Sequence, residues 1–407
     1  MRTGVFIAGL AGNNGSTLAA FLQLDKQKKQ ALPGSIVRHG TVASLKKPVS
    51  NFIAEPDFIP IRGWEIRKIQ KWKNILIEND IIPMKDIESV YECLDNNVQI
   101  LKGVGSTEYV NLRAEDPVQT ECSKLWGKTA VEKLKTDIDD FANQYHLTHV
   151  SVIYSGSTEQ NVDWNFKDDK TWPPSVHYAM AALNANVNCS FVNAAAQISV
   201  CEEMIALFDK THRICIICND LSTGQTKLKR NIADMFLSCG FPLRYVASTN
   251  YLSNLDGFNL QGQAQNKSKI LTKSSMIDAC VSERPGITND GQSIPHHVNI
   301  AYVEGVGDDK LALDEYNFNL AFNKNSTLST RMLCKDTLLA LPLLFDLCVL
   351  LPILTQKSKS SVEASNILAY YFKNIKDLKE SSQFLLTQLN VLTEFIADNS
   401  SDVRVKK

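Results

Sequence analysis

Four lysines in separate parts of the chain are the residues whose types and spacing best suit chemistry on an anion. Lys269 and Lys273 lie four residues apart and would share one face of a helix, where an anion between them would relieve the repulsion of like charges. Lys310 follows a strand-like segment, and Lys373 follows three aromatic residues, whose rings would desolvate its ammonium and lower its pKa toward use as an acid or base. Taken singly, each lysine could equally be a solvated surface residue.

A polar segment, Asn219–Thr226, has the residue types of a phosphate site at the start of a helix. It follows the apolar run Arg213–Cys218 and precedes the predicted helix Lys227–Cys239. N–H groups at a helix start lack intrahelical partners and therefore suit an anion. The candidate phosphate contacts are Ser222, Gly224, Gln225 and Thr226. Asp220 would repel a phosphate, so we expect it to orient a cation or a cofactor; an ordinary capped loop is the alternative for the whole segment.

A glycine-rich turn, Gly9–Gly15, stands where a dinucleotide fingerprint requires it. It follows the predicted strand Thr3–Ala8 and opens a helix from about Ser16 to Lys26. Gly12 would let the backbone approach a pyrophosphate, and the helix start supplies free N–H groups. The spacing departs from the strict G-x-G-x-x-G pattern at Ala11, so a mere tight turn is the alternative.

Glu65 is the candidate reader of the cofactor ribose, because no acidic residue in a suitable setting stands about 20 residues after the turn. It follows the strand-like segment Phe58–Ile61. A carboxylate there would accept both ribose hydroxyls and disfavour a 2′-phosphate, which favours NAD over NADP. A surface charge is the alternative interpretation.

The segments that must position these residues indicate an α/β fold with a parallel sheet. Strand-like runs such as Thr148–Tyr154 alternate with helices and loops, and the stretch Lys26–Lys47 is expected to form loops. Leu243–Ser248 and Val298–Val303 alternate as strands around an irregular polar segment, and the chain looks helical from Asp336 to near residue 398. A central insert between two parts of a nucleotide-binding domain is therefore expected.

Bulk composition excludes several classes of protein. With 407 residues the chain exceeds one ordinary core, and a net charge of −1 gives no field that would attract nucleic acid or a membrane surface. The apolar stretch Thr337–Leu354 contains Asp346 and two prolines, which favours a buried helix over a membrane span. Cys215 and Cys218 have CxxC spacing, but no second ligand pair completes a metal set, so no metal is predicted. Reduced thiols and the lack of a signal peptide predict a soluble, cytoplasmic protein.

Seven motifs, in matching order from Gly4 to about Lys373, resemble those of the myo-inositol-phosphate synthase family. They are GLAGNNGSTL at Gly9, GWEI at Gly63, NDLSTGQTKLK at Asn219, NYLSNLDGFNL at Asn250, SKILTKSSMIDA at Ser268, YVEGVGDDKLALDEY at Tyr302 and LCKDTLLALPLLFDL at Leu333. The resemblance implies a Rossmann-type NAD-binding domain built from both chain ends, residues 1–226 and 339–407. It also implies an α+β catalytic and tetramerisation insert, residues 227–338, in a homotetramer.

The resemblance also implies roles for residues at the motif positions. Contacts to NAD would fall on Gly12, Asn13, Asn14, Glu65, Ser155, Gly156, Ser157, Thr158, Asp220, Asp308 and Asp336. Contacts to substrate and phosphate would fall on Ser222, Gly224, Gln225, Thr226, Asn254, Lys273 and Lys310. Acid–base chemistry would rest on Lys269 and Lys373 at O5 of the sugar, with Lys310 serving O1 and the phosphate.

The implied reaction is the NAD-dependent closure of D-glucose 6-phosphate to 1D-myo-inositol 3-phosphate, the first step of inositol biosynthesis. C5 is oxidised, the C6 proton is removed, C6 attacks the C1 aldehyde, and the hydride returns to C5. Ammonium groups would stabilise the oxyanions that develop at O5 and O1. Departures from the family pattern at Ala11, Ala194–Ala196, Leu255 and Lys335 leave two alternatives: an NAD-linked sugar-phosphate dehydrogenase, or a catalytically impaired NAD-binding homologue.

Overall fold

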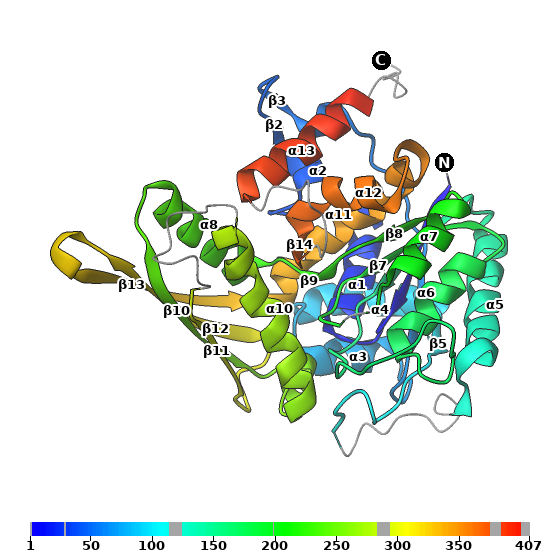
Figure 1. Cartoon of the computed structure of the whole chain (residues 1–407). Helices are drawn as coiled ribbons and strands as arrows, with labels where there is room; N and C mark the ends of the chain where they lie inside the picture. The colour runs from blue at the N-terminus through cyan, green and yellow to red at the C-terminus, as the bar shows by residue number, and fades with distance from the viewer. Residues whose placement is uncertain are drawn as a thin grey trace.

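The larger sheet of the protein has six parallel strands in the order β5-β4-β1-β6-β7-β8 (Figure 1). The computed structural model describes residues 2–27, 30–113, 124–197, 199–282, 294–374 and 384–399. The six strands are β1 (Thr3–Ala8), β4 (Ile61–Glu65), β5 (Ile100–Lys102), β6 (His149–Tyr154), β7 (Asn188–Asn193) and β8 (Ile214–Ile216). The order is that of a doubly wound dinucleotide-binding sheet, in which the ligand lies at the carboxyl ends of the central strands. The predicted α/β class is confirmed.

Both faces of this sheet are buried, which explains why its strands are mostly apolar. Along β1, Val5 and Ile7 face one core while Phe6 and Ala8 face the other, because successive side chains point to opposite sides of a strand. The first core is closed by α1 (Asn13–Gln27), α3 (Trp72–Asn79), α4 (Met84–Asn97), α11 (Asp336–Lys357), α12 (Ser361–Ile367) and α13 (Leu385–Asp398). The second is closed by α5 (Gly127–Tyr145), α6 (Pro174–Asn184) and α7 (Glu202–Lys210).

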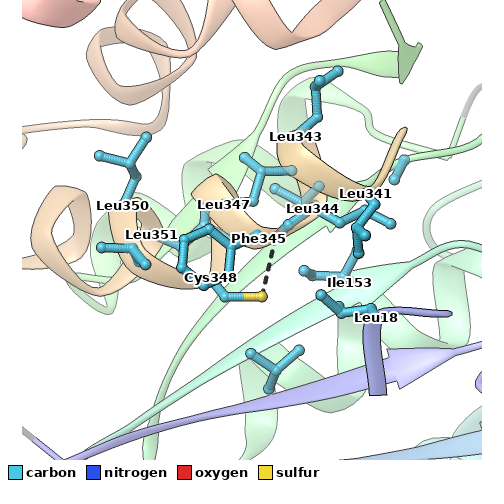
Figure 2. Close-up of a cluster of buried hydrophobic side chains, with 14 of the residues drawn as sticks. Leu18, Ile153, Leu341, Leu343, Leu344, Phe345, Leu347, Cys348, Leu350 and Leu351 are labelled. Carbon is cyan, nitrogen blue, oxygen red and sulfur yellow. Dashed lines mark hydrogen bonds between the residues drawn. The ribbon is translucent and has the colours of Figure 1, made fainter. Parts of the chain in front are cut away.

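Helix α11 brings the C-terminal part of the chain into the first core. Its residues Leu344 and Leu351 are fully buried, and the helix packs beside Leu18 of α1 and Ile153 of β6 (Figure 2). In the described ranges it is the one helix long and apolar enough to cross a membrane, but 83% of its apolar window is buried inside the protein. Its apolar sequence is therefore explained by a place in the core, as expected.

The second sheet has four strands in the order β11-β10-β12-β13. Its strands are β10 (Leu243–Leu252), β11 (His296–Tyr302), β12 (Asp309–Asn319) and β13 (Asn325–Lys335), and only the β10–β11 pair is parallel. Helices α8 (Gly224–Ser238) and α10 (Gln263–Ser282) pack against it through a small core that includes Phe236, Ile277 and Tyr316. The short helix α9 (Leu255–Asn259) follows β10.

A two-stranded antiparallel ribbon lies between the two larger sheets (Figure 1). It pairs β9 (Asn219–Leu221) with β14 (Phe372–Asn374) in a register that sets Phe372 opposite Leu221. The prediction of continuous helix from Asp336 to near residue 398 is wrong here, because Lys373 lies on a strand. The strand forms because Phe372 pairs with Leu221, a partner about 150 residues away that no local pattern reveals.

Other element bounds differ from the sequence-based expectations by a few residues. Helix α1 begins at Asn13 rather than at Ser16, and Glu65 ends its strand, which starts at Ile61. The stretch expected to form loops contains α2 (Ile36–His39) and a hairpin of β2 (Thr41–Val42) and β3 (Lys47–Pro48). These elements are too short to give a recognisable period in the sequence.

A buried carboxylate on α11 ties this helix to two other segments. Asp346 is fully buried and accepts hydrogen bonds from the Ser35 hydroxyl, from the Ile36 N–H (2.6 Å) and from the Tyr371 hydroxyl (2.9 Å). Burial raises the pKa of Asp346 to about 6, although these hydrogen bonds oppose the rise. Asp346 therefore holds the segment that leads into Lys373.

The substitution Asp346→Ala should leave three donors without their acceptor and cost about 2–4 kcal/mol of unfolding free energy. Urea denaturation of the variant and of the unchanged chain measures this loss. Leu338→Ala on the same helix, at a side chain that is 42% exposed, is the control and should cost under about 1 kcal/mol. Equal losses in the two variants would contradict the role given to Asp346.

Candidate functional site

The site is a cleft lined by residues from both larger sheets and from the ribbon between them. Its walls come from the turn after β1, the carboxyl ends of β4 and β6, helices α9 and α10, and the start of α11. Most residues singled out from the sequence line it: Gly12, Asn13, Asn14, Glu65, Ser155, Gly156, Ser157, Thr158, Asp220, Asn254, Lys269, Lys273, Lys310, Asp336 and Lys373. Segments far apart in the chain therefore meet around one space.

The turn after β1 has the close packing that a dinucleotide fingerprint needs. Gly9 has a φ of +85°, and a Cβ at Gly15 would lie 2.5 Å from the Gly9 carbonyl oxygen, so larger residues are excluded at both positions. The Asn14 amide donates to the Ser155 hydroxyl at 3.2 Å, which joins the turn to the loop after β6. The buried Oδ1 of Asn13 has no partner among the described residues. The turn thus offers the free backbone N–H groups of a helix start to a pyrophosphate.

Glu65 ends β4, the strand next to β1, and is only 4% exposed. Its Oε1 accepts from the Ile66 N–H (2.9 Å) and the Arg67 N–H (3.1 Å), and its carboxylate is ion-paired with the Arg67 guanidinium at 3.0 Å. Burial would raise the pKa of Glu65, but the charge and hydrogen bonds of Arg67 hold it below its ordinary value. The carboxylate is therefore ionised and already paired.

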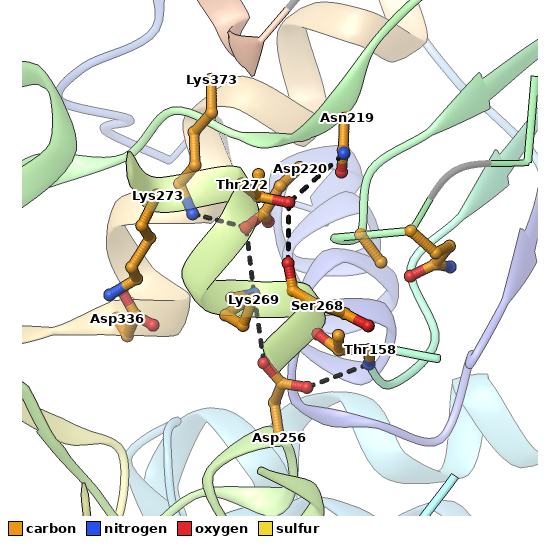
Figure 3. A network of polar contacts seen from close by, with 12 residues as sticks. Thr158, Asn219, Asp220, Asp256, Ser268, Lys269, Thr272, Lys273, Asp336 and Lys373 are labelled. Carbon is orange, nitrogen blue, oxygen red and sulfur yellow. Dashed lines mark hydrogen bonds and ion pairs between the residues drawn. The ribbon is translucent and has the colours of Figure 1, made fainter. Parts of the chain in front are cut away.

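Asp220 on the ribbon lies at the centre of a network of charged side chains (Figure 3). Its Oδ2 contacts the ammonium of Lys373 at 2.5 Å and that of Lys269 at 3.0 Å, while Lys269 also pairs with Asp256 at 3.2 Å. Asp256 in turn accepts a hydrogen bond from the Thr158 N–H at 3.1 Å. The network joins the ribbon, α10, α9 and the loop after β6, and within it Asp220 is ion-paired with two lysines.

The two lysines on Asp220 differ in pKa although they share one carboxylate oxygen. Burial lowers the pKa of Lys373 to about 8, and its neighbours Lys269 and Lys310 also act to lower it, against the opposing charge of Asp220. Burial would also lower the pKa of Lys269, but the charges of Asp220 and Asp256 raise it above its ordinary value. Lys269 is therefore a permanent cation, while Lys373 can lose its proton near neutral pH.

Lys310 and Lys273 form the other end of the cluster. Lys310 is ion-paired with Asp336 at 3.1 Å, and this carboxylate raises its pKa against the effect of burial. Lys273 donates to the Asn250 amide oxygen at 3.0 Å, and no carboxylate is ion-paired with it in the described part of the chain. Burial, followed by the charge of Lys310, lowers the pKa of Lys273 well below its ordinary value. An anion bound beside Lys273 would supply the negative charge that no ion-paired carboxylate among the described residues provides there.

Five residues predicted to contact ligands do not line the cleft: Ser222, Gly224, Gln225, Thr226 and Asp308. Asp308 instead accepts hydrogen bonds from Thr337 and, at 3.5 Å, from the Asn13 amide, so it lies behind the glycine turn. In the polar segment before α8 the cleft is lined by Thr223, which immediately precedes the helix. Thr223 is the N-cap residue of α8, and a phosphate contact at the start of this helix remains a prediction.

Sequence analysis missed four side chains that belong to this arrangement: Thr223, Asn250, Asp256 and Lys229. Asn250 and Asp256 both lie in the motif NYLSNLDGFNL, where a buried amide and a carboxylate two residues after Asn254 could have drawn notice. Lys229 is 1% exposed, donates to the Ser248 hydroxyl at 3.0 Å, and has a pKa lowered to about 8, first by burial. Nothing in its local sequence distinguishes it from a surface lysine.

The described residues contain no group of three or more His, Cys, Asp or Glu placed to hold a metal ion. Of the CxxC pair, Cys215 is buried on β8, and the Cys218 thiol donates to the Asn193 carbonyl at 3.2 Å. Burial raises the pKa of both thiols, which makes them inert core residues.

Comparisons with known proteins agree with this geometry. The NAD-binding family described as myo-inositol-1-phosphate synthase matches residues 3–396. The inositol-3-phosphate synthase of Trypanosoma brucei brucei is 30% identical over 388 residues, covering 86% of this chain and 72% of the relative. The enzyme of the same name from Saccharomyces cerevisiae is 27% identical and covers 92% of this chain and 77% of the relative.

Solved structures show the same fold. The inositol-3-phosphate synthase of Caenorhabditis elegans superposes with a TM-score of 0.85 at 23% identity, covering 98% of this chain and 86% of that chain. A myo-inositol-1-phosphate synthase-related protein from Thermotoga maritima has a TM-score of 0.75 at 18% identity, covering 97% of this chain and 98% of that chain.

The glycine turn provides a graded test of dinucleotide binding. A Cβ at Gly12 would meet only the Gly9 carbonyl oxygen, at 3.3 Å, so Gly12→Ala should fold normally and lose about tenfold or more in NAD affinity by blocking the pyrophosphate. A Cβ at Gly15 would lie within 2.7 Å of three backbone atoms, so Gly15→Ala should lose thermal stability as well. Calorimetric titration and thermal melts separate the two effects, and unchanged NAD affinity in both variants would refute this assignment.

Proposed function

The chain belongs to the myo-inositol-1-phosphate synthase family, and from this we propose that it binds NAD and converts D-glucose 6-phosphate to 1D-myo-inositol 3-phosphate. One observation carries the proposal most directly. Four lysines from α10, β12 and β14 converge in the cleft that the glycine turn also lines; Lys273, Lys310 and Lys373 are buried, and the Lys269 side chain is 13% exposed. This is the arrangement that a phosphorylated sugar beside a nicotinamide ring would require.

Lys373 and Lys269 divide the proton chemistry at O5 in this proposal. When bound, NAD supplies a reversible hydride acceptor for C5, so the overall reaction has no net redox change. A neutral Lys373 accepts the O5 proton as C5 is oxidised, and the shared carboxylate of Asp220 keeps its amine in place. Lys269 stays charged and stabilises the oxygen at C5 as negative charge develops during removal of the C6 proton.

Lys310 and Lys273 serve the other oxygens of the substrate. Lys310, kept charged by Asp336, stabilises O1 when the C1 aldehyde becomes an alkoxide during ring closure. Lys273 binds the phosphate, whose negative charge replaces the carboxylate partner that this lysine lacks within the described ranges. The Nδ2 of Asn250, beside Lys273, has no hydrogen-bond partner among the described residues and is a further donor to the phosphate.

The remaining proposals concern organisation. Residues 1–226 and 339–407 form the NAD-binding domain, and residues 227–338 form the catalytic domain through which a homotetramer assembles. The place of α11 in the first core and the packing of α8 and α10 on the second sheet support these boundaries. Asn254 and the residues at the start of α8 contact the substrate, and the enzyme acts in the cytoplasm without nucleic acid or membrane partners.

Incubation with glucose 6-phosphate and NAD should yield inositol phosphate without net NADH. Lys269→Ala should reduce the rate of product formation at least about 100-fold, because it removes a charge from the reacting oxygen. Lys267→Ala, at an exposed position on the same helix, is the matched control and should retain activity. Net NADH appearing on substrate addition would indicate a dehydrogenase instead, and NAD binding without any turnover would indicate a catalytically impaired homologue.

The pKa of Lys373 gives a prediction about pH. Only the neutral amine can accept a proton, so kcat/KM should rise with pH and level off above about 8, the pKa of this group in the free enzyme. Lys373→Arg keeps the charge but cannot lose its proton, so it should lower kcat about 100-fold or more while NAD affinity persists. A Lys373→Arg variant with the original rate and pH profile would exclude this role.

A further inference from the structure

The Glu65–Arg67 pair at the cofactor end of the cleft has a geometry that bears on cofactor choice. Arg67 contacts the Glu65 carboxylate through two nitrogens, with Nε at 3.2 Å from Oε1 and Nη2 at 3.0 Å from Oε2. Both residues line the cleft, and Glu65 stands at the end of the strand next to β1, two residues before Arg67. The pair is therefore part of the wall that the adenosine ribose of a dinucleotide would meet.

The pairing changes what Glu65 can do there. A carboxylate at this point of a doubly wound sheet normally accepts the ribose hydroxyls and repels a 2′-phosphate. In this chain Oε1 of Glu65 already accepts from the Ile66 and Arg67 N–H groups and from the Arg67 side chain. The negative charge is balanced by a guanidinium, which is the group that binds phosphate most effectively through paired hydrogen bonds.

We propose that this cleft accepts NADP as well as NAD, with Arg67 as the residue that sets the preference. A 2′-phosphate draws the Arg67 guanidinium, which is 16% exposed, away from Glu65 and onto the phosphate oxygens, whereas NAD leaves the ion pair intact. The inference rests on the proposed function only through the shared cofactor cleft, since it concerns binding rather than turnover. It revises the sequence-based expectation for Glu65, which did not weigh Arg67.

Calorimetric titration of the intact protein with NAD and with NADP tests the proposal. The unchanged chain should bind the two cofactors with dissociation constants within about tenfold of each other. Arg67→Ala should weaken NADP binding at least about tenfold, since a charge-assisted contact is lost, while NAD affinity stays the same or rises. Lys68→Ala, at the exposed neighbouring position, is the matched control and should leave the NADP-to-NAD ratio unchanged within about threefold.

Glu65→Gln provides an independent variant with Arg67 retained. It removes the competing carboxylate charge, so the preference should move toward NADP relative to the unchanged chain. The proposal is overturned if NADP binds more than about tenfold weaker than NAD in the unchanged chain, or if Arg67→Ala weakens both cofactors equally. Failure of NAD to bind would contradict the proposed function itself. Normal NAD binding with weak NADP binding would contradict only the proposal about NADP, so the two conclusions are tested separately.

Discussion

The contact of one buried carboxylate oxygen with two ammonium groups is the interaction on which the site depends. Asp220 is 6% exposed and adopts a left-handed backbone conformation, with a φ of +60° that non-glycine residues rarely take. Its N–H donates to the Ala195 carbonyl at 3.0 Å, and its neighbours on β9 pair with β14, so the conformation is held from two sides. Such strain persists where surrounding contacts determine the backbone, as they do at functional sites.

Sharing Asp220 makes two lysines chemically different. Lys269 has a second carboxylate, Asp256, and keeps its proton, whereas Lys373 is ion-paired with Asp220 alone among the described residues and is more deeply buried. The two lysines on Asp220 are thus one amine that can exchange a proton and one cation that cannot, without any difference in residue type. A reaction that needs a base at one moment and a fixed charge throughout requires both.

The same contacts also connect the two larger sheets. Asp256 accepts from the Thr158 N–H, and the Asn259 amide donates to the Thr158 carbonyl at 2.8 Å, so α9 is fastened to the loop after β6. The Gln265 amide donates to the Tyr109 carbonyl at 2.9 Å, which adds a link from α10 to the segment after β5. These hydrogen bonds join α9 and α10 to loops that follow strands of the larger sheet, and α10 carries part of the lysine cluster. The protein's own contacts therefore help to fix the distance between the glycine turn and the lysines.

Local sequence was sufficient for the features that depend on residue type and short-range period. The buried strand before Gly9–Gly15, the shared helical face of Lys269 and Lys273, and the core position of the helix around Asp346 all follow from patterns within one or two turns. The order of the motifs was sufficient to indicate the family and hence the fold, since motif spacing reflects the whole chain.

Only the tertiary structure decided which charges meet. Local sequence suggested a helix around Lys373, but this residue lies on a strand that pairs with another strand about 150 residues earlier, and its amine therefore contacts Asp220. In the folded chain Thr223, and not Ser222, lines the cleft. Asp256 contacts Lys269 and the Thr158 N–H, which are partners that its own segment of sequence does not contain. The physical reason is that a charge interacts according to distance and solvation, and both are set by contacts between segments that are remote in the chain.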